Sequence, residues 1–80
     1  MRQNVKRRER NRRYRSAART HIRRSRELIA AGRFEEAEEA VRQAVSTLDK
    51  AARKGVIHPN NAARRKSRIM SQLAEAKQAA

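Results

Sequence analysis

The sequence predicts an all-α protein, a three-helix up-down-up bundle with a long, basic, projecting N-terminal helix. Apolar residues recur at helical spacing in three segments. Two short breaks, Gly32 and the stretch Gly55–Pro59, separate these segments. Because short connections make neighbouring helices antiparallel, an up-down-up bundle follows. We expect helices over about residues 5–31, 34–53 and 61–78.

Composition restricts the class of protein before any motif is used. The chain has 80 residues, with 22 Lys and Arg against 8 Asp and Glu, and a formal net charge of +14. A chain of this length and charge is expected to form one small domain with a basic surface. Such a surface predicts an anionic macromolecular partner. No cysteine is present, which fits an intracellular protein,. No apolar run approaches the roughly 18 residues of a membrane span, so we expect no membrane partner.

The first helix should carry arginine on one side and apolar residues on a neighbouring side. At about 100° per residue, one strip about 80° wide contains a row of arginines, one per turn. This arginine row consists of Arg8, Arg12, Arg15, Arg19, Arg23 and Arg26. The apolar face begins only at Tyr14, because Arg7 and Arg10 occupy its backward extension,. Residues 14–80 should therefore form the bundle. Residues 1–13 should form a basic arm, disordered when free and helical when a polyanion is bound.

The second helix should be structural. Gly32 can supply the left-handed residue that ends the first helix, and Gly55 can end the second with Val56 folding back as in a Schellman motif,. The second helix opens with four glutamates, where the helix dipole favours acids. We expect these acids to point away from the polyanion and not to form a catalytic pair. They are Glu35, Glu36, Glu38 and Glu39.

The stretch Lys54–Arg68 breaks a local rule. Asn60 or Asn61 can cap the third helix, but no acid stands between Arg53 and Arg68. The first turns of that helix instead carry cations, which the helix dipole disfavours. A polyanion would remove the conflict by accepting backbone N–H groups and guanidinium forks. We therefore interpret this stretch as a phosphate-binding corner. Its cations are Arg64, Arg65, Lys66 and Arg68.

Other chemistry has little support in the sequence. His21 and His58 lie far apart without cysteine, so no metal site is expected,. No Gly-rich phosphate loop and no nucleophile motif is present, so we expect no cofactor, no small-molecule substrate and no enzymatic activity. A helix-turn-helix DNA reader needs a turn of about three or four residues, shorter than the loop from Lys54 to Asn60. A generic basic helical nucleic-acid chaperone or DNA-binding protein remains the alternative.

The run Leu48–Arg68 resembles the C-terminal signature of a known family, the twentieth protein of the bacterial small ribosomal subunit. The matching residues include Lys54-Gly55, His58, Asn60 and Lys66-Ser67-Arg68, and the pairs Arg15-Ser16 and Arg19-Thr20 are similar as well. The resemblance implies a cytoplasmic structural constituent of the small subunit. Such a protein binds small-subunit ribosomal RNA directly, supports its folding and assembly, and has other ribosomal components as possible partners.

The resemblance also implies RNA contacts at matched positions. These are Arg12, Arg15, Ser16, Arg19, Arg23, Lys54, His58, Asn60, Arg64, Lys66, Ser67 and Arg68. The row and the corner add Arg8, Arg26 and Arg65 to the expected RNA-binding residues,. Two departures stand out. Arg33 replaces the usual Asp, which weakens the cap of the second helix, and Pro59 stands where a basic residue is common.

Overall fold

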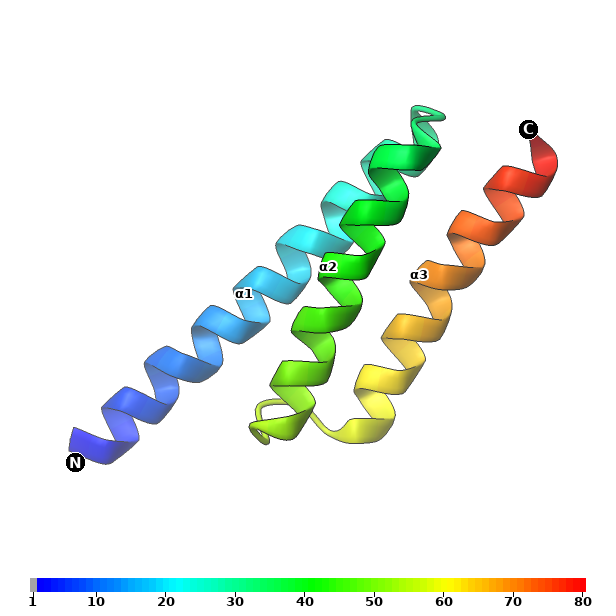
Figure 1. Cartoon of the computed structure of the whole chain (residues 1–80). Helices are drawn as coiled ribbons and strands as arrows, with labels where there is room; N and C mark the ends of the chain where they lie inside the picture. Colours follow the sequence, from blue (N-terminus) through cyan, green and yellow to red (C-terminus); the bar gives the residue numbers. More distant parts are fainter. Residues whose placement is uncertain (1) are drawn as a thin grey trace.

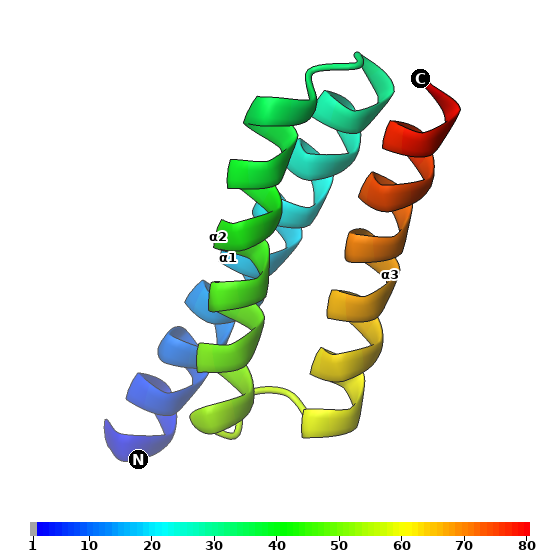
Figure 2. The same ribbon diagram turned by 45° about the vertical axis from the view of Figure 1, so that its right-hand side comes forward.

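The computed structural model describes residues 2–80 and contains three helices. They are α1 (Arg2–Ala30), α2 (Phe34–Arg53) and α3 (Pro59–Ala79), and the described residues contain no strand. Figure 1 shows α2 antiparallel to both of its neighbours, which confirms the all-α bundle with a long first helix. The molecule measures 52 × 21 × 13 Å along its principal axes. The first turns of α1 extend beyond the α2–α3 loop (Figure 2).

The core is built mostly from alanine. Leu48 is fully buried and clusters with Ala18 of α1 and Ala62 of α3. A Leu48→Ala change would cost about 2–5 kcal/mol in this setting. Alanine has no side chain beyond Cβ, so helix axes can approach closely where it is buried. The other buried alanines all come from α2, namely Ala37, Ala40, Ala44 and Ala51.

The helical spacing predicts that Ile69 and Leu73 lie on one apolar face of α3 with Met70 beside them, but the observed apolar face is narrower. Ile69 is buried as expected, and Leu73 is half-buried. Met70, expected beside them, is 54% exposed. It lies next to Ile69 in sequence and so points about 100° away around the helix. The part of the chain that the structure describes has no helix long and apolar enough to cross a membrane.

The α1–α2 corner is a Schellman motif, with Gly32 as the expected left-handed residue. Gly32 has φ 75°, and its N–H donates to the Ile29 carbonyl at 3.1 Å. The N–H of Arg33 donates to the Leu28 carbonyl at 3.0 Å,. Arg33 is the N-cap of α2 and provides no side-chain cap hydrogen bond. The start of α2 is therefore uncapped, as the departure at this position predicts.

The α2–α3 corner repeats the same motif. Gly55 has φ 75°, its N–H donates to the Ala52 carbonyl at 3.1 Å, and the Val56 N–H donates to the Ala51 carbonyl at 2.9 Å. Val56 folds back and is only 5% exposed. The apolar contact expected beside a Schellman motif is therefore present.

The start of α3 differs from the sequence expectation. The helix begins at Pro59, and its N-cap is His58, with φ −69° and ψ 141°. The Nδ1 atom of His58 accepts the Asn60 N–H at 3.1 Å. The predicted caps, Asn60 and Asn61, were wrong because both lie inside the helix. Proline at the first helical position needs no N–H partner and favours the earlier start.

Helix α1 also touches the α2–α3 loop. The sequence indicates packing only from Tyr14 onward, but Arg10 donates to the Lys54 carbonyl at 3.5 Å. Arg15 donates to the Val56 carbonyl at 3.3 Å. The carbonyls of Lys54 and Val56 have no hydrogen-bond partner within a helix, and arginines of α1 donate to both of them instead,. In the structure α1 continues through residues 2–13; the order of this basic arm without RNA stays a prediction.

Candidate nucleic-acid interface

The arginine row lies on the surface of α1. All six of its members are exposed. A hollow along the helix is lined by Arg8, Arg12, Arg15 and Arg19, together with Ser16 and no acid. Successive turns of the helix, about 5.4 Å apart, therefore present one guanidinium each. Arg23 is exposed on the same face of α1.

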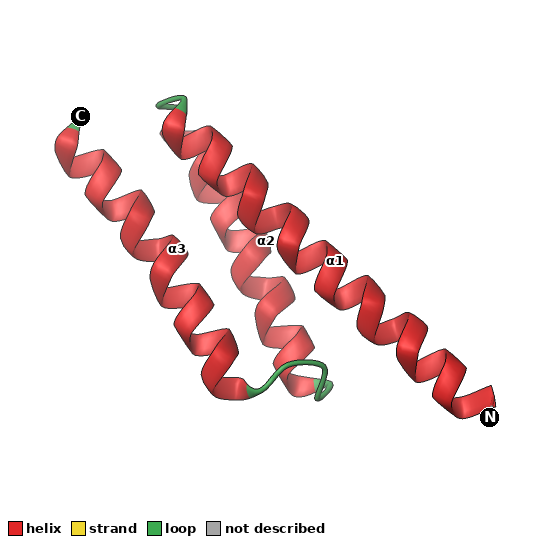
Figure 3. Ribbon diagram, turned by 180° about the vertical axis from the view of Figure 1, so that it is seen from behind, coloured by secondary structure: helices red, strands yellow, loops and turns green. Residues whose placement is uncertain are grey.

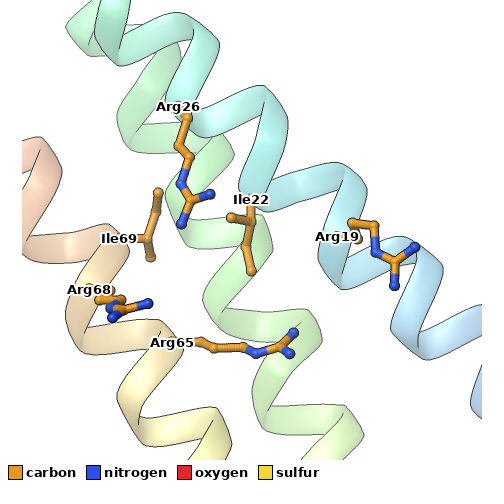
Figure 4. Close-up of a pocket in the computed structure, with 6 residues that line it drawn as sticks. All are labelled: Arg19, Ile22, Arg26, Arg65, Arg68 and Ile69. Atoms are coloured by element: carbon orange, nitrogen blue, oxygen red, sulfur yellow. The ribbon is translucent and has the colours of Figure 1, made fainter.

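The fold joins this row to the arginines of α3. A cleft of about 220 Å³ lies between the two helices, and Figure 4 shows its arginines around two isoleucines. We call it the α1–α3 cleft, and its lining residues are Arg19, Ile22, Arg26, Arg65, Arg68 and Ile69. Helices α1 and α3 run in the same direction because α2 reverses the chain between them (Figure 3). Arginines 39 to 49 residues apart in sequence thereby share one cleft.

A second cleft lies toward the α2–α3 corner. Arg15, Arg19 and Arg65 line it with His58, over a volume of about 370 Å³. Asn61 lines it as well, and its Oδ1 accepts from Nε of Arg65 at 3.2 Å. Sequence reasoning missed Asn61 as a lining residue. The i, i+4 spacing of Asn61 and Arg65 on one helix face was the available signal.

Other predicted site residues lie outside these two clefts. Arg64 and Ser67 line a neighbouring hollow with Arg26 and Arg68. Lys54 and Asn60 are exposed at the corner. Lys66 differs from them, because its Nζ lies 2.6 Å from Oδ1 of Asp49, and both side chains are less than half exposed. Its ammonium is therefore neutralised on the α2 side, away from the arginines.

The glutamates that open α2 lie apart from the two arginine clefts. Glu36 pairs with Arg33 at 3.6 Å, and Glu39 pairs with Arg42 at 3.2 Å. Glu38 pairs with Lys77 of α3. No acid of the described chain lines the α1–α3 cleft or the cleft at the corner. The two clefts are therefore surfaces of a single charge sign, which concentrates the positive potential there.

The fold and these clefts define a small, strongly basic helical-bundle protein with an arginine-lined side. The family model for ribosomal protein S20 matches residues 1–74. The chain therefore belongs to the ribosomal protein S20 family, as the resemblance in the corner residues indicated.

Several relatives show the same relationship, each described as small ribosomal subunit protein bS20. The protein of Thermomicrobium roseum is 54% identical over 73 residues, which cover 91% of this chain and 74% of that one. The protein of Dehalococcoides mccartyi is 52% identical over 69 residues, covering 86% and 78%. The protein of Beutenbergia cavernae is 48% identical over 73 residues, covering 91% and 85%.

Family membership decides the broad class of function. The chain is a structural component of the small ribosomal subunit and not an enzyme. It is therefore located in the cytoplasm, within the ribosome. The predictions of ribosomal function, of localisation and of a non-enzymatic role are confirmed.

Proposed function

We propose that this protein binds small-subunit ribosomal RNA directly and supports its folding and assembly. The observation that carries the proposal is the gathering of arginines from α1 and α3 into clefts without an acid. The ion-paired glutamates lie apart from these clefts, and Glu75 lines only a neighbouring hollow, with Arg26 and Arg68. RNA phosphates supply the missing negative charge.

The arginines of the row and of α3 make most of the proposed contacts. A planar guanidinium fork can bind a phosphate through two parallel hydrogen bonds, which ammonium cannot do. The proposed RNA-binding residues are Arg8, Arg12, Arg15, Ser16, Arg19, Arg23, Arg26, Lys54, His58, Asn60, Arg64, Arg65, Ser67 and Arg68. Lys66 joins this set only by exchanging Asp49 for a phosphate.

His58 has two roles in this proposal. Its Nδ1 caps α3 by accepting the Asn60 N–H, which leaves Nε2 for RNA. The imidazole is exposed at the corner and lines the cleft that also contains Arg15 and Arg65. The cap fixes the position of the ring, so that a local structural bond also orients a proposed RNA contact.

A binding titration tests the proposal. The full chain is titrated with small-subunit ribosomal RNA in the presence of excess transfer RNA, at 50 and at 200 mM salt. With about six to ten phosphate contacts, affinity should fall by roughly 10³ to 10⁵ between these salt concentrations. Transfer RNA should compete poorly. A nearly flat salt dependence would contradict binding to a polyanion, and equal competition by transfer RNA or DNA would favour the generic chaperone or DNA-binding alternative.

A further inference from the structure

The α1–α3 cleft contains four arginines and no carboxylate. Arg19 and Arg26 come from α1, and Arg65 and Arg68 come from α3 (Figure 4). Among residues 2–80, none of these guanidiniums forms an ion pair. The floor between them is apolar, and like charges beside an apolar wall repel more strongly than in open water. The free protein therefore holds a cluster of positive charge at this seam; Glu75 lines an adjoining hollow with Arg26 and Arg68, but none of the ion pairs of the described residues includes it.

Helices α1 and α3 also contact each other less than either of them contacts α2. Helix α3 is tied to α2 by the ion pairs Lys66–Asp49 and Lys77–Glu38. Within the described chain, no hydrogen bond or ion pair joins α3 to α1. Apolar packing around Ile69 and in the cluster of Ala18, Leu48 and Ala62 holds the two helices together against the repulsion of their arginines.

The dimensions of the cleft favour a small anionic group. Its volume of about 220 Å³ is below the roughly 300–1,000 Å³ of pockets that enclose whole ligands. Arg65 is oriented in advance, because its Nε donates to Asn61 Oδ1 at 3.2 Å and its two terminal nitrogens are left for a ligand. Guanidinium forks bind phosphate and carboxylate alike. Membership in a ribosomal protein family favours phosphate.

We propose that the α1–α3 cleft is a phosphate site that ties α3 to α1. One backbone phosphate of the bound RNA lies between guanidiniums of both helices and cancels their repulsion. The inference rests on the proposed RNA-binding function and deepens it, because it makes the stability of the bundle depend on the ligand. A group that binds only the folded state stabilises that state by mass action.

Inorganic phosphate is the probe in the first experiment. The melting temperature of the full chain is followed by circular dichroism in phosphate and in chloride of equal ionic strength. At a phosphate concentration ten times its Kd, the Tm should rise by roughly 5–10 °C. In the variant carrying Arg65→Gln and Arg68→Gln this rise should disappear. In low salt without phosphate, that variant should melt no earlier than the parent protein, because the repulsion has been reduced.

Two further variants serve as controls. Arg13→Gln with Arg24→Gln removes the same charge from exposed positions of α1 outside the cleft, and it should keep the full rise in Tm. Arg65→Lys with Arg68→Lys keeps the charge and removes the fork, and it should give a smaller rise. An equal rise in all variants would indicate a general effect of the ion on folding and would overturn the site.

The same variants separate this inference from the proposed function. Inorganic phosphate should weaken RNA binding by the parent protein more than chloride does at equal ionic strength. The reason is that inorganic phosphate and the RNA backbone phosphate compete for the same cleft. If phosphate neither stabilises the parent protein nor competes, while the double Gln variant still loses RNA affinity, the cleft proposal fails and RNA binding stands. If polyglutamate stabilises the protein as well as phosphate does, the cleft fits an acidic protein partner and the phosphate assignment is wrong.

Discussion

The two corners of the chain have the same backbone geometry but differ in the charge of the helix that follows. Gly32 and Gly55 both have φ 75°, and each closes a Schellman motif. After the first corner, α2 opens with Glu35 and Glu36 in its first turn. After the second corner, α3 has no acid in its first turn. The turn itself therefore requires only glycine, and the charge that follows it is set by something else.

The magnitudes indicate what sets that charge. A cation near a helix N-terminus costs a few tenths of a kcal/mol, whereas a hydrogen bond to a charged group contributes about 1.5–3 kcal/mol. A single phosphate contact thus outweighs the dipole cost of the arginine that makes it. We expect the first corner, whose following helix opens with acids, to serve the fold alone. The second, whose following helix opens with none, is the corner to test for binding.

Charge reversal at the second corner should give the largest effect. Arg64→Glu with Arg68→Glu removes two proposed phosphate contacts and adds two repulsive ones. We expect RNA affinity to fall by roughly 10³-fold or more. The free bundle should be as stable as before or slightly more stable, because the exchange reduces the repulsion among the cations of α1 and α3,. Thermal melts and RNA titrations on one preparation would measure both. A variant that melts earlier yet binds normally would refute the phosphate corner.

A pair of double variants compares the arginine row with the acids of α2. Arg15→Ala with Arg19→Ala should weaken RNA binding by about 10²-fold, at roughly 1.5 kcal/mol for each lost charged contact. Glu36→Ala with Glu39→Ala should hardly change it, because these acids form only exposed pairs with Arg33 and Arg42,. Titration against the same RNA fragment gives both numbers. Equal losses would show that the binding face has been chosen wrongly.

Arg15 needs its own control, because it also donates to the Val56 carbonyl. Arg15→Ala could therefore loosen the α2–α3 loop as well as remove a phosphate contact. Helicity measured by circular dichroism on the same variant separates the two. Among the described residues, the Arg19 side chain forms no hydrogen bond. Arg19→Ala alone should therefore leave the α2–α3 loop intact.

Patterns within one helix predicted most of this fold. The apolar spacing and the two glycines gave all three helices and both Schellman motifs, and Leu48, Ala62 and Ile69 are buried as their spacing indicates. These features depend on residues within about four positions of one another. The early start of α3 was also readable, since proline commonly occupies the first helical position. Its N-cap was not, because histidine is an unusual capping residue.

Contacts between helices were less predictable. Lys66 looks like Arg65 and Arg68 in the sequence, but it pairs with Asp49 because α3 turns that side toward α2. The rotation of α3 about its axis is fixed by packing of the whole bundle and leaves no local signal. The same holds for Arg10 and Arg15, whose bonds to loop carbonyls depend on how α1 passes the loop. The sequence thus indicated which residue types bind, and the fold decided which of them face one cleft.

The glycines allow a matched test of the two corners. A Cβ built at Gly32 or at Gly55 meets no atom within 4 Å, so the Cβ itself fits and the cost comes from the left-handed backbone conformation. Gly32→Val and Gly55→Val should each lower stability by about 1–2 kcal/mol. Only Gly55→Val should also weaken RNA binding in conditions where both variants are folded, since it displaces His58 and Asn60. Equal binding losses would mean that both corners support the interface through stability alone.

The smallest effect should come from repairing the cap of α2. Arg33→Asp places an acceptor at the N-cap, where capping contributes about 1 kcal/mol, and replaces a cation that the helix dipole disfavours. Two effects reduce the gain in stability from the new cap. The cap residue has ψ 73°, so its backbone must shift toward the extended region, and the exposed pair with Glu36 is lost,. We expect about 0.5 kcal/mol of added stability, or roughly 2–4 °C in Tm.

RNA affinity should be unchanged in Arg33→Asp, although the net charge falls by two, because this corner lies outside the arginine clefts. Arg33→Gln is the matched control, since it removes the cation without supplying a charged cap acceptor. It should show little of the gain in Tm. If Arg33→Asp binds RNA more weakly than Arg33→Gln by more than its extra charge explains, the first corner contacts RNA as well. The contrast between a structural and a binding corner would then be lost.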